Sequence, residues 1–254
     1  MKKFISILLI LVLLGVLGYC VWQIVGITDE YQAGVEVYEE LEQFVVMPET
    51  VPVETTADEE IVEAETEPAA IQWPEVDFEA LSRVNGDIVG WLYIPGTVIN
   101  YPVVQGDDNE YYLKHLFDGK TNSSGCIYLD CGAEGDFTSM NSVLHGHHMK
   151  NGSMFAGICK YKDQSYFDEH PTAMLLTPDG RYEVKFFSGY VCETTSDAWD
   201  YDFDEAWIDK RIRSSYFDAD VIPTTEDRIL TLSTCSYEFA DARFVLHGVL
   251  IKAE

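Results

Sequence analysis

The stretch Thr231-Leu232-Ser233-Thr234-Cys235 ends an apolar, alternating run that begins at Arg228. Such alternation is typical of a β-strand, and this strand ends in a cysteine. A thiol in the interior of a strand is hidden, whereas a thiol at the end of a strand can reach a substrate. The stretch therefore predicts a strand that exposes Cys235 to a ligand.

Two other predicted strands carry ionisable side chains at their ends. Arg243 begins the run 243–250, and the run 142–147 ends in imidazoles, with His148 directly after it. Cysteine, histidine and arginine are the residue types of a thiol acyl-transfer site, where they act as nucleophile, proton carrier and oxyanion cation. The three strand ends therefore predict one site that contains Cys235, a histidine and Arg243.

Each of these residues also has an ordinary structural interpretation. A cysteine in an apolar run is more often a small buried side chain than a nucleophile, and Arg243 could be a surface charge at a strand end. The segment His145-Gly146-His147-His148 could begin a metal site, but no Asp or Glu follows within the next ten residues. The chemical interpretation depends on the joint occurrence of all three residue types.

The combination resembles the sortase family, the cysteine transpeptidases of Gram-positive cell surfaces. The family motif Thr-Leu-x-Thr-Cys matches residues 231–235 at every fixed position. The essential histidine of the family follows a glycine at a strand end, which corresponds to His147 after Gly146, and its essential arginine begins the last strand, which corresponds to Arg243. This sequence departs from the expected pattern at His145, where an aromatic residue such as Tyr is expected.

The resemblance covers about residues 73–254. Residues 89–97 and 99–106 are similar to the opening strands of a sortase, and 108–113, 151–155 and 204–212 are similar to class B in particular. A mainly β fold is implied, an eight-stranded sortase-type β-barrel with short inserted helices, and the pattern of short apolar runs agrees with a barrel. The predicted strands are 87–94, 98–104, 126–129, 142–147, 173–177, 182–191, 229–235 and 243–251, and the predicted helices are 78–84, 111–116, 154–160 and 203–214.

The resemblance also implies the reaction. Cys235 would attack a carbonyl at a Thr in the C-terminal sorting signal of a surface protein, and an amine of a cell-wall precursor or cross-bridge would accept the thioacyl group. His147 would protonate the leaving amine and deprotonate the incoming one, and Arg243 would donate to the oxyanion or hold the substrate backbone. Ser233 and Thr234 are expected to support the nucleophile, and neither a metal nor another cofactor is implied.

Two other functions are compatible with the same residues. One is a thiol peptidase that does not transfer the acyl group, which product analysis with and without added amine would distinguish. The other is a membrane-tethered binding module with an inactive site, which trapping of an acyl-enzyme would exclude.

The beginning of the sequence predicts a membrane anchor. Residues 4–26 form a nearly unbroken apolar run of membrane-spanning length, with Lys2 and Lys3 before it and acidic residues after it. The positive-inside rule then places the N-terminus in the cytoplasm and the catalytic domain outside the cell. A cleaved signal peptide is the alternative, but the apolar run is long and no small-x-small site follows it. Residues 1–27 are therefore expected to be the cytoplasmic N-terminus and transmembrane anchor.

The composition changes after the apolar run. No Lys or Arg occurs between Lys3 and Arg83, Glu is frequent, and prolines interrupt the segment. Because such sequence repels itself and buries little surface, 28–72 is expected to be an extended acidic extracellular linker, in which 36–46 could form a short helix. The sortase domain is then 73–254. The net charge of −28 argues against nucleic acid as a partner, since phosphate contacts need basic patches.

The cysteine count leaves a free thiol outside the membrane. Cys20 lies in the apolar run, and the other five cysteines follow it, so at least one of the five is unpaired in a monomer. A catalytic Cys235 must be free. Cys126 and Cys131 are expected on opposite faces of a strand, which disfavours a bridge between them, and the sequence does not decide whether Cys159 pairs with Cys192.

Overall fold

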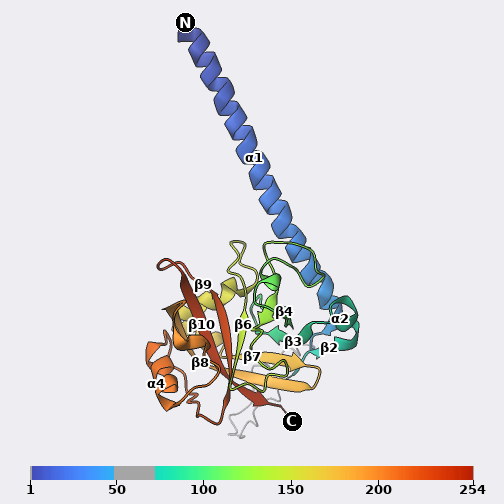
Figure 1. Cartoon of the computed structure of the whole chain (residues 1–254), viewed down its shortest axis with the longest axis vertical. Helices are drawn as coiled ribbons and strands as arrows, with labels where there is room; N and C mark the ends of the chain where they lie inside the picture. The colour runs from blue at the N-terminus through green and yellow to red at the C-terminus, as the bar shows by residue number, and fades with distance from the viewer. Residues whose placement is uncertain (1, 49–71, 254) are drawn as a thin grey trace, which may run out of the picture.

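A long helix, α1 (Lys2–Leu41), leads into a closed β-barrel in the computed structural model, which describes residues 2–48 and 72–253 (Figure 1). The barrel strands are β3 (Ile88–Tyr93), β4 (Asn100–Val104), β5 (Ile127–Leu129), β6 (Asn141–His145), β7 (Thr172–Thr177), β8 (Gly180–Glu193), β9 (Arg228–Cys235) and β10 (Ala242–Lys252). The helices that follow α1 are α2 (Phe78–Val84), α3 (Gln164–Glu169) and α4 (Glu205–Ser214), and the 3-10 helices are η1 (Glu42–Phe44), η2 (Tyr111–Leu113), η3 (Phe155–Lys162) and η4 (Asp197–Trp199). The predicted eight-stranded barrel with short inserted helices is confirmed.

The strand order around the barrel is β10-β8-β7-β3-β4-β5-β6-β9. β6 and β9 are parallel neighbours, and β10 runs antiparallel to β9. As a result, β6 and β9 end, and β10 begins, at the same end of the barrel. The topology therefore brings together the three strand ends that carry the predicted site residues.

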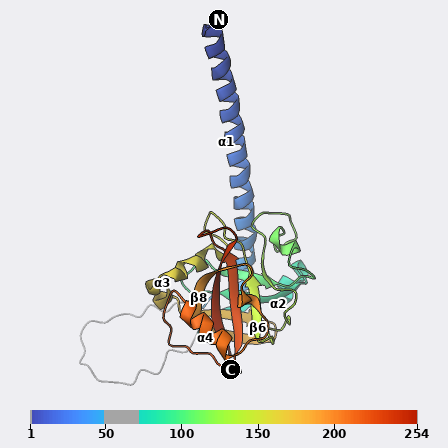
Figure 2. The ribbon, with the colours of Figure 1, turned by 60° about the vertical axis from the view of Figure 1, so that its left-hand side comes forward.

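Strand β9 is buried on both faces, because the barrel core lies on one side of it and further elements cover the other. Leu230 and Leu232 belong to the main core, whereas Ile229 packs in a second cluster with Trp207 and Ile208 of α4. Helix α4 begins with an N-cap, since the side chain of Asp204 accepts a hydrogen bond from the backbone N–H of Trp207. Figure 2 shows α4 on the outside of the barrel.

Strand β6 ends at His145, two residues earlier than the predicted end at His147. Gly146 still bonds to β9 through its N–H, which donates to the carbonyl of Ser233 (3.1 Å), but the carbonyl of His147 accepts from Phe155 outside the barrel ladder (2.9 Å). A Cβ atom at position 146 would lie 2.5 Å from Ile127 Cδ1 and 2.6 Å from Phe155 Cδ2, so glycine allows the chain to leave the strand at this point.

The structure does not agree with an extended linker between residues 28 and 46. Helix α1 continues to Leu41, and Tyr38, Leu41 and Val45 are buried in the main core with exposed fractions of 7%, 5% and 9%. β1 (Val45–Val46) then pairs with β2 (Glu75–Val76), two strands that were not predicted. The short helix expected within 36–46 is the last part of α1 as far as Leu41, and its apolar residues pack on the barrel while the charged residues occupy the other faces of the helix. Residues 49–71 of the predicted linker lie outside the described residues.

Candidate active site

A cleft of about 300 Å³ opens at the end of the barrel where β6 and β9 end and β10 begins. It brings together the three predicted residues Cys235, His147 and Arg243. The other residues that line it come from four parts of the chain, namely η2, the segment 128–146, the loop after β8 and the end of β9: Leu113, Tyr128, His145, Gly146, Thr194, Trp199, Ser233 and Thr234.

The thiol and the guanidinium lie on neighbouring strands. Cys235 of β9 and Arg243 of β10 are register partners in the antiparallel ladder, and directly opposed residues have Cβ atoms about 4.5–5.5 Å apart on the same face of a sheet. Nη1 of Arg243 donates to the carbonyl of Ala242 at 3.1 Å. The sheet therefore fixes a permanent cation beside the thiol.

The ring of His147 is held by a backbone carbonyl. Its Nε2 lies 2.8 Å from the carbonyl oxygen of Leu113 in η2. Because a carbonyl oxygen only accepts hydrogen bonds, Nε2 is the donor, and the neutral imidazole then has an unprotonated Nδ1. This hydrogen bond selects the tautomer in which Nδ1 can take up a proton.

The neighbouring histidine lies elsewhere. Nδ1 of His148 donates to the carbonyl oxygen of Cys235 at 2.9 Å, and its ring packs edge-on against Tyr237 with ring centroids 5.1 Å apart. Of the two adjacent residues, His147 lines the cleft and His148 lines a different cavity. His148 therefore supports the backbone at the end of β9 and does not line the cleft.

His145 and its partner Asp130 form a polar cluster in the wall of the cleft. Nε2 of His145 lies 3.0 Å from Oδ2 of Asp130, and its ring stacks on Tyr128 at 5.1 Å. Tyr201 and Asn109 also donate to this carboxylate, at 2.5 and 2.9 Å. Burial would raise the pKa of the Asp130 carboxyl, but these hydrogen bonds outweigh burial and hold the pKa well below its usual range. Asp130 was not predicted as a site residue, and its only signal in the sequence is its position directly after a predicted strand.

The two expected supporting residues of β9 have different partners. Oγ of Ser233 accepts a hydrogen bond from Nε1 of Trp199 at 3.1 Å, and Oγ1 of Thr234 donates to the carbonyl of Gly146 at 2.7 Å. Ser233 thus holds the wall that Trp199 forms, whereas Thr234 joins β9 to the end of β6. Thr194 and Trp199 were missed because they lie between β8 and α4, where the short 3-10 helix η4 and its flanking residues have no periodic pattern.

The six cysteines are all unpaired in the described part of the chain. Burial raises the pKa of Cys126 to about 12, and burial also raises the pKa of Cys159 and Cys192. A thiol with a raised pKa is a poorer nucleophile at neutral pH, because less of it is thiolate. These three cysteines are therefore poor competitors for the role predicted for Cys235. Residues 2–48 and 72–253 contain no group of three or more His, Cys, Asp or Glu arranged to hold a metal ion.

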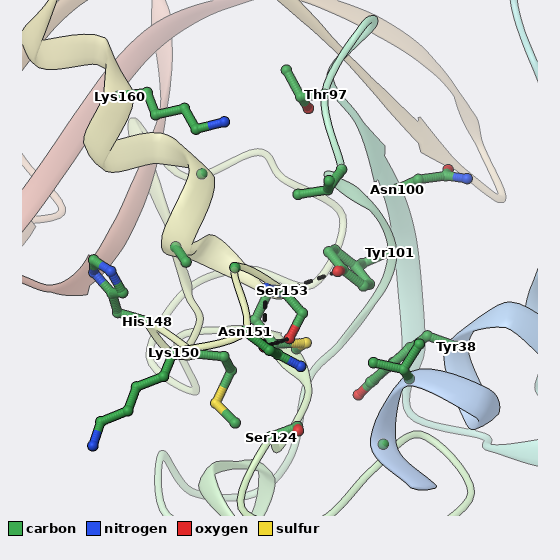
Figure 3. Close-up of a pocket in the computed structure, with 18 of the residues that line it drawn as sticks. Tyr38, Thr97, Asn100, Tyr101, Ser124, His148, Lys150, Asn151, Ser153 and Lys160 are labelled. Carbon is green, nitrogen blue, oxygen red and sulfur yellow. Dashed lines mark hydrogen bonds between the residues drawn. The ribbon is translucent and has the colours of Figure 1, made fainter. Parts of the chain in front are cut away.

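A larger groove of about 1170 Å³ lies between α1 and the barrel (Figure 3). Tyr38 of α1 lies on one side of it, and His148, Lys150 and Lys160 lie on the other. Cys235, His147 and Arg243 are not among its described lining residues. The three predicted residues therefore share the smaller cleft. The groove lies next to this cleft, since His148, which lines the groove, directly follows His147 in the chain.

Comparison with known proteins identifies the family. The family model of the sortase domain matches residues 92–251 of the sequence. The chain belongs to the sortase family. Sortase B of Listeria monocytogenes is 37% identical over 180 residues, which cover 67% of this chain and 72% of that protein. Sortase B of Staphylococcus aureus is 35% identical over 182 residues, which cover 69% of this chain and 75% of that protein.

Solved structures of class B sortases have the same fold. The complex of Staphylococcus aureus sortase B with substrate superposes with a TM-score of 0.66 at 34% identity, over 70% of this chain and 85% of that chain. A sortase B structure from Bacillus anthracis superposes with a TM-score of 0.69 at 29% identity, over 89% of this chain and all of that chain (100%). The protein is thus a class B-like sortase, a cysteine transpeptidase that anchors surface proteins.

Proposed function

We propose that Cys235 is the nucleophile of this sortase, that His147 carries the protons and that Arg243 stabilises the oxyanion. The observation that supports this assignment is the single cleft shared by the three side chains, with Arg243 opposite Cys235 in the ladder. Arg243 is cationic at any relevant pH, and its donors can meet the negative charge that develops on the attacked carbonyl oxygen.

In the first half of the reaction, the sulfur of Cys235 forms a bond to the carbonyl carbon of a Thr in the sorting signal. As the sulfur attacks, the thiol proton passes to Nδ1 of His147. The C–N bond after this Thr then breaks, and His147 gives this proton to the leaving amine. A thioester remains on the enzyme. In the second half, an acceptor amine attacks the thioester, His147 takes the proton of this amine, and the thiolate of Cys235 leaves.

The two substrates are proposed from the family and its solved complexes. One relative was solved in complex with substrate, and another sortase B was solved with triglycine, which has a free amine. For this chain we propose a surface protein with a C-terminal sorting signal as the acyl donor, and an amine of a peptidoglycan precursor or cross-bridge as the acceptor. The separate roles of donor and acceptor distinguish a transpeptidase from a peptidase.

The proposed location is the cell membrane, with α1 as a single-pass anchor. Helix α1 contains a stretch that is long and apolar enough to cross a bilayer. Lys2 and Lys3 precede this stretch and acidic residues follow it, which favours a cytoplasmic N-terminus and an extracellular catalytic domain.

A trapping experiment tests the assignment of the nucleophile. The protein is incubated with a sorting-signal peptide, with and without an amine, and the acyl-enzyme is detected by its added mass. Cys235→Ala should abolish the acyl-enzyme, the cleavage and the transfer, whereas Cys131→Ala, which removes an exposed thiol outside the cleft, should retain all three. Turnover by folded Cys235→Ala protein would show that another group is the nucleophile, and unchanged hydrolysis with no amide product would favour the peptidase.

A further inference from the structure

We propose that the catalytic end of the barrel rests on the membrane that α1 crosses, with the loops 149–153 and 236–241 among the lipid headgroups. This inference rests on the membrane anchoring proposed above. It assigns a surface of the catalytic domain to a partner, the polar layer of the bilayer. The structure supports it through the position at which α1 docks, the distance between this position and the apolar run, and the loops that lie at the same end.

The docking position of α1 and the cleft lie at the same end of the barrel. Tyr128 pairs with His145 in an antiparallel ladder, and His145 pairs with Ser233 in a parallel ladder. Strand β5 therefore begins at the end where β6 and β9 finish. Helix α1 binds the segment directly before β5, since the hydroxyl of Tyr38 donates to the carbonyl of Gly125 at 2.5 Å.

The first contact between α1 and the catalytic domain lies within one helical turn of the apolar run. The last exposed apolar residue of this run is Ile27, and Glu30 already contacts the barrel. The carbonyl of Glu30 accepts from Nδ2 of Asn122 at 2.8 Å, and its carboxylate accepts from the N–H of Ser123 at 2.8 Å. The distance along the helix axis from Ile27 to Glu30, three residues later, is about 5 Å. The headgroup layer on each side of the hydrocarbon is about 5–7 Å thick, so this contact lies within it.

The contact between α1 and the catalytic domain is closely packed, through the backbone of the helix and through side chains. A Cβ atom at Gly34 would lie 2.8 Å from Oγ of Ser124, so the bare backbone of the helix packs on this loop. Further along, Tyr38 packs edge-on against Tyr101 at 5.3 Å, and Leu41 is buried. Helix α1 therefore fixes both the height and the orientation of the barrel above the membrane.

The loops at this end carry residues that suit the membrane interface. Tyr237 and Phe239 of the β9–β10 loop have exposed fractions of 71% and 45%, and Lys150 is exposed in the loop after β6. Aromatic side chains and lysines are typical of the boundary between lipid and water. In Figures 1 and 2 the β9–β10 loop lies at the end of the barrel from which α1 leaves. The groove of Figure 3 lies between α1 and the loops at this end of the barrel.

Photo-crosslinking of the full chain in nanodiscs tests the proposal. p-Benzoylphenylalanine replaces Asn151 in one protein and, as the control, Asp179 in another. Both positions are exposed, but Asp179 lies in the β7–β8 turn at the opposite end of the barrel. After irradiation, mass spectrometry should detect lipid adducts at position 151 at least tenfold more often than at position 179. Equal yields at the two positions would overturn the proposal.

A helical insertion separates this proposal from the anchoring. Eighteen helix-forming residues between Thr28 and Asp29 add five whole turns and raise the barrel by about 27 Å without turning it. The adducts at position 151 should then fall to the level of position 179, whereas cleavage of a soluble peptide should stay within twofold. Persistent adducts would show that α1 does not set the height. If the unmodified chain does not co-elute with the nanodiscs in size-exclusion chromatography, both the anchoring and this inference fail. If it co-elutes but lipid adducts are no more frequent at position 151 than at position 179, only this inference fails.

Discussion

Three histidines within four residues have three different partners, and these partners distinguish their roles. His145 binds the carboxylate of Asp130, His147 donates to the carbonyl of Leu113, and His148 donates to the carbonyl of Cys235. His145 and His147 line the cleft, and only His147 is held there by a neutral acceptor without a carboxylate. Among the three, His147 is therefore best placed to exchange protons with a substrate.

The prediction at this scale is a difference between neighbouring alanine variants. His147→Ala should lose at least ~100-fold in transfer rate, because it removes the proposed general acid–base. His148→Ala should lose much less, because it removes a hydrogen bond to the backbone of Cys235 and no group from the cleft. Rates are compared at matched folding, checked by circular dichroism. If the His148→Ala variant is inactive and the His147→Ala variant is active, His148 and not His147 is the proton carrier.

Some residues of the candidate site could be selected from the sequence, and others could not. Cys235, His147 and Arg243 could be selected because each lies at or beside the end of an apolar run, and their roles stay predictions. Asp130 and Trp199 could not be selected, because Trp199 reaches the cleft from the short 3-10 helix η4 and Asp130 acts only through its hydrogen bond to His145. Contacts of this kind depend on how distant segments fold back, and local periodicity carries no information on them.

At the scale of elements, Asp130 joins two parts of the cleft wall. Its carboxylate binds His145 of β6 on one side and Tyr201 of the β8–β9 loop on the other. The same loop carries Trp199, which hydrogen-bonds to Ser233 of β9. One carboxylate thus holds the loop against the strand whose extension carries His147.

Removing this charge should lower the stability in a pH-dependent way. Asp130→Asn should cost about 2 kcal/mol at pH 7, as expected for charge-assisted hydrogen bonds, which corresponds to a melting temperature lower by about 4–8 °C. Because the folded-state pKa of Asp130 is lowered, its contribution is complete above the ordinary carboxyl pKa of about 4 and is lost as the pH falls through the folded-state value. The difference between the melting temperatures of the two proteins should therefore stay constant down to about pH 4 and should narrow as the pH falls further toward the folded-state value. A difference that does not narrow below about pH 4 would show that the carboxylate charge is not the cause.

The elements themselves were largely predictable, and their ends were not. All eight barrel strands occur where the alternating runs predicted them, because one or both faces are buried. The end of β6 was placed two residues too late, since the carbonyl of His147 accepts from the N–H of Phe155 at the start of η3 and not from a neighbouring strand. Helix α3 and the strands β1 and β2 are short, and short elements have little periodicity to detect.

At the scale of the whole molecule, α1 belongs both to the proposed anchor and to the folded domain. Its first part is apolar and exposed, whereas Tyr38 and Leu41 near its end are buried in the barrel core together with Val45 beyond it. The expected domain boundary near residue 72 followed the change in average composition. The spacing of the apolar residues allowed a short helix over 36–46, but it did not show that this helix packs on the barrel and belongs to the folded domain.

The corresponding prediction is a difference between two truncated chains. A chain that begins at Asp29 should melt at least 10 °C higher than a chain that begins at Gln72, because the shorter chain loses three buried side chains, each worth about 1.5–3 kcal/mol. The shorter chain should also aggregate more readily, since the core surface beneath Tyr38, Leu41 and Val45 becomes exposed. As a matched control, Tyr38→Ala and Leu41→Ala combined in the longer chain should reproduce most of the loss. Equal melting temperatures for the two truncated chains would show that the domain begins near residue 72 and that α1 is only a tether. In that case the packed contact that is proposed to hold the cleft at the membrane would not contribute to the fold.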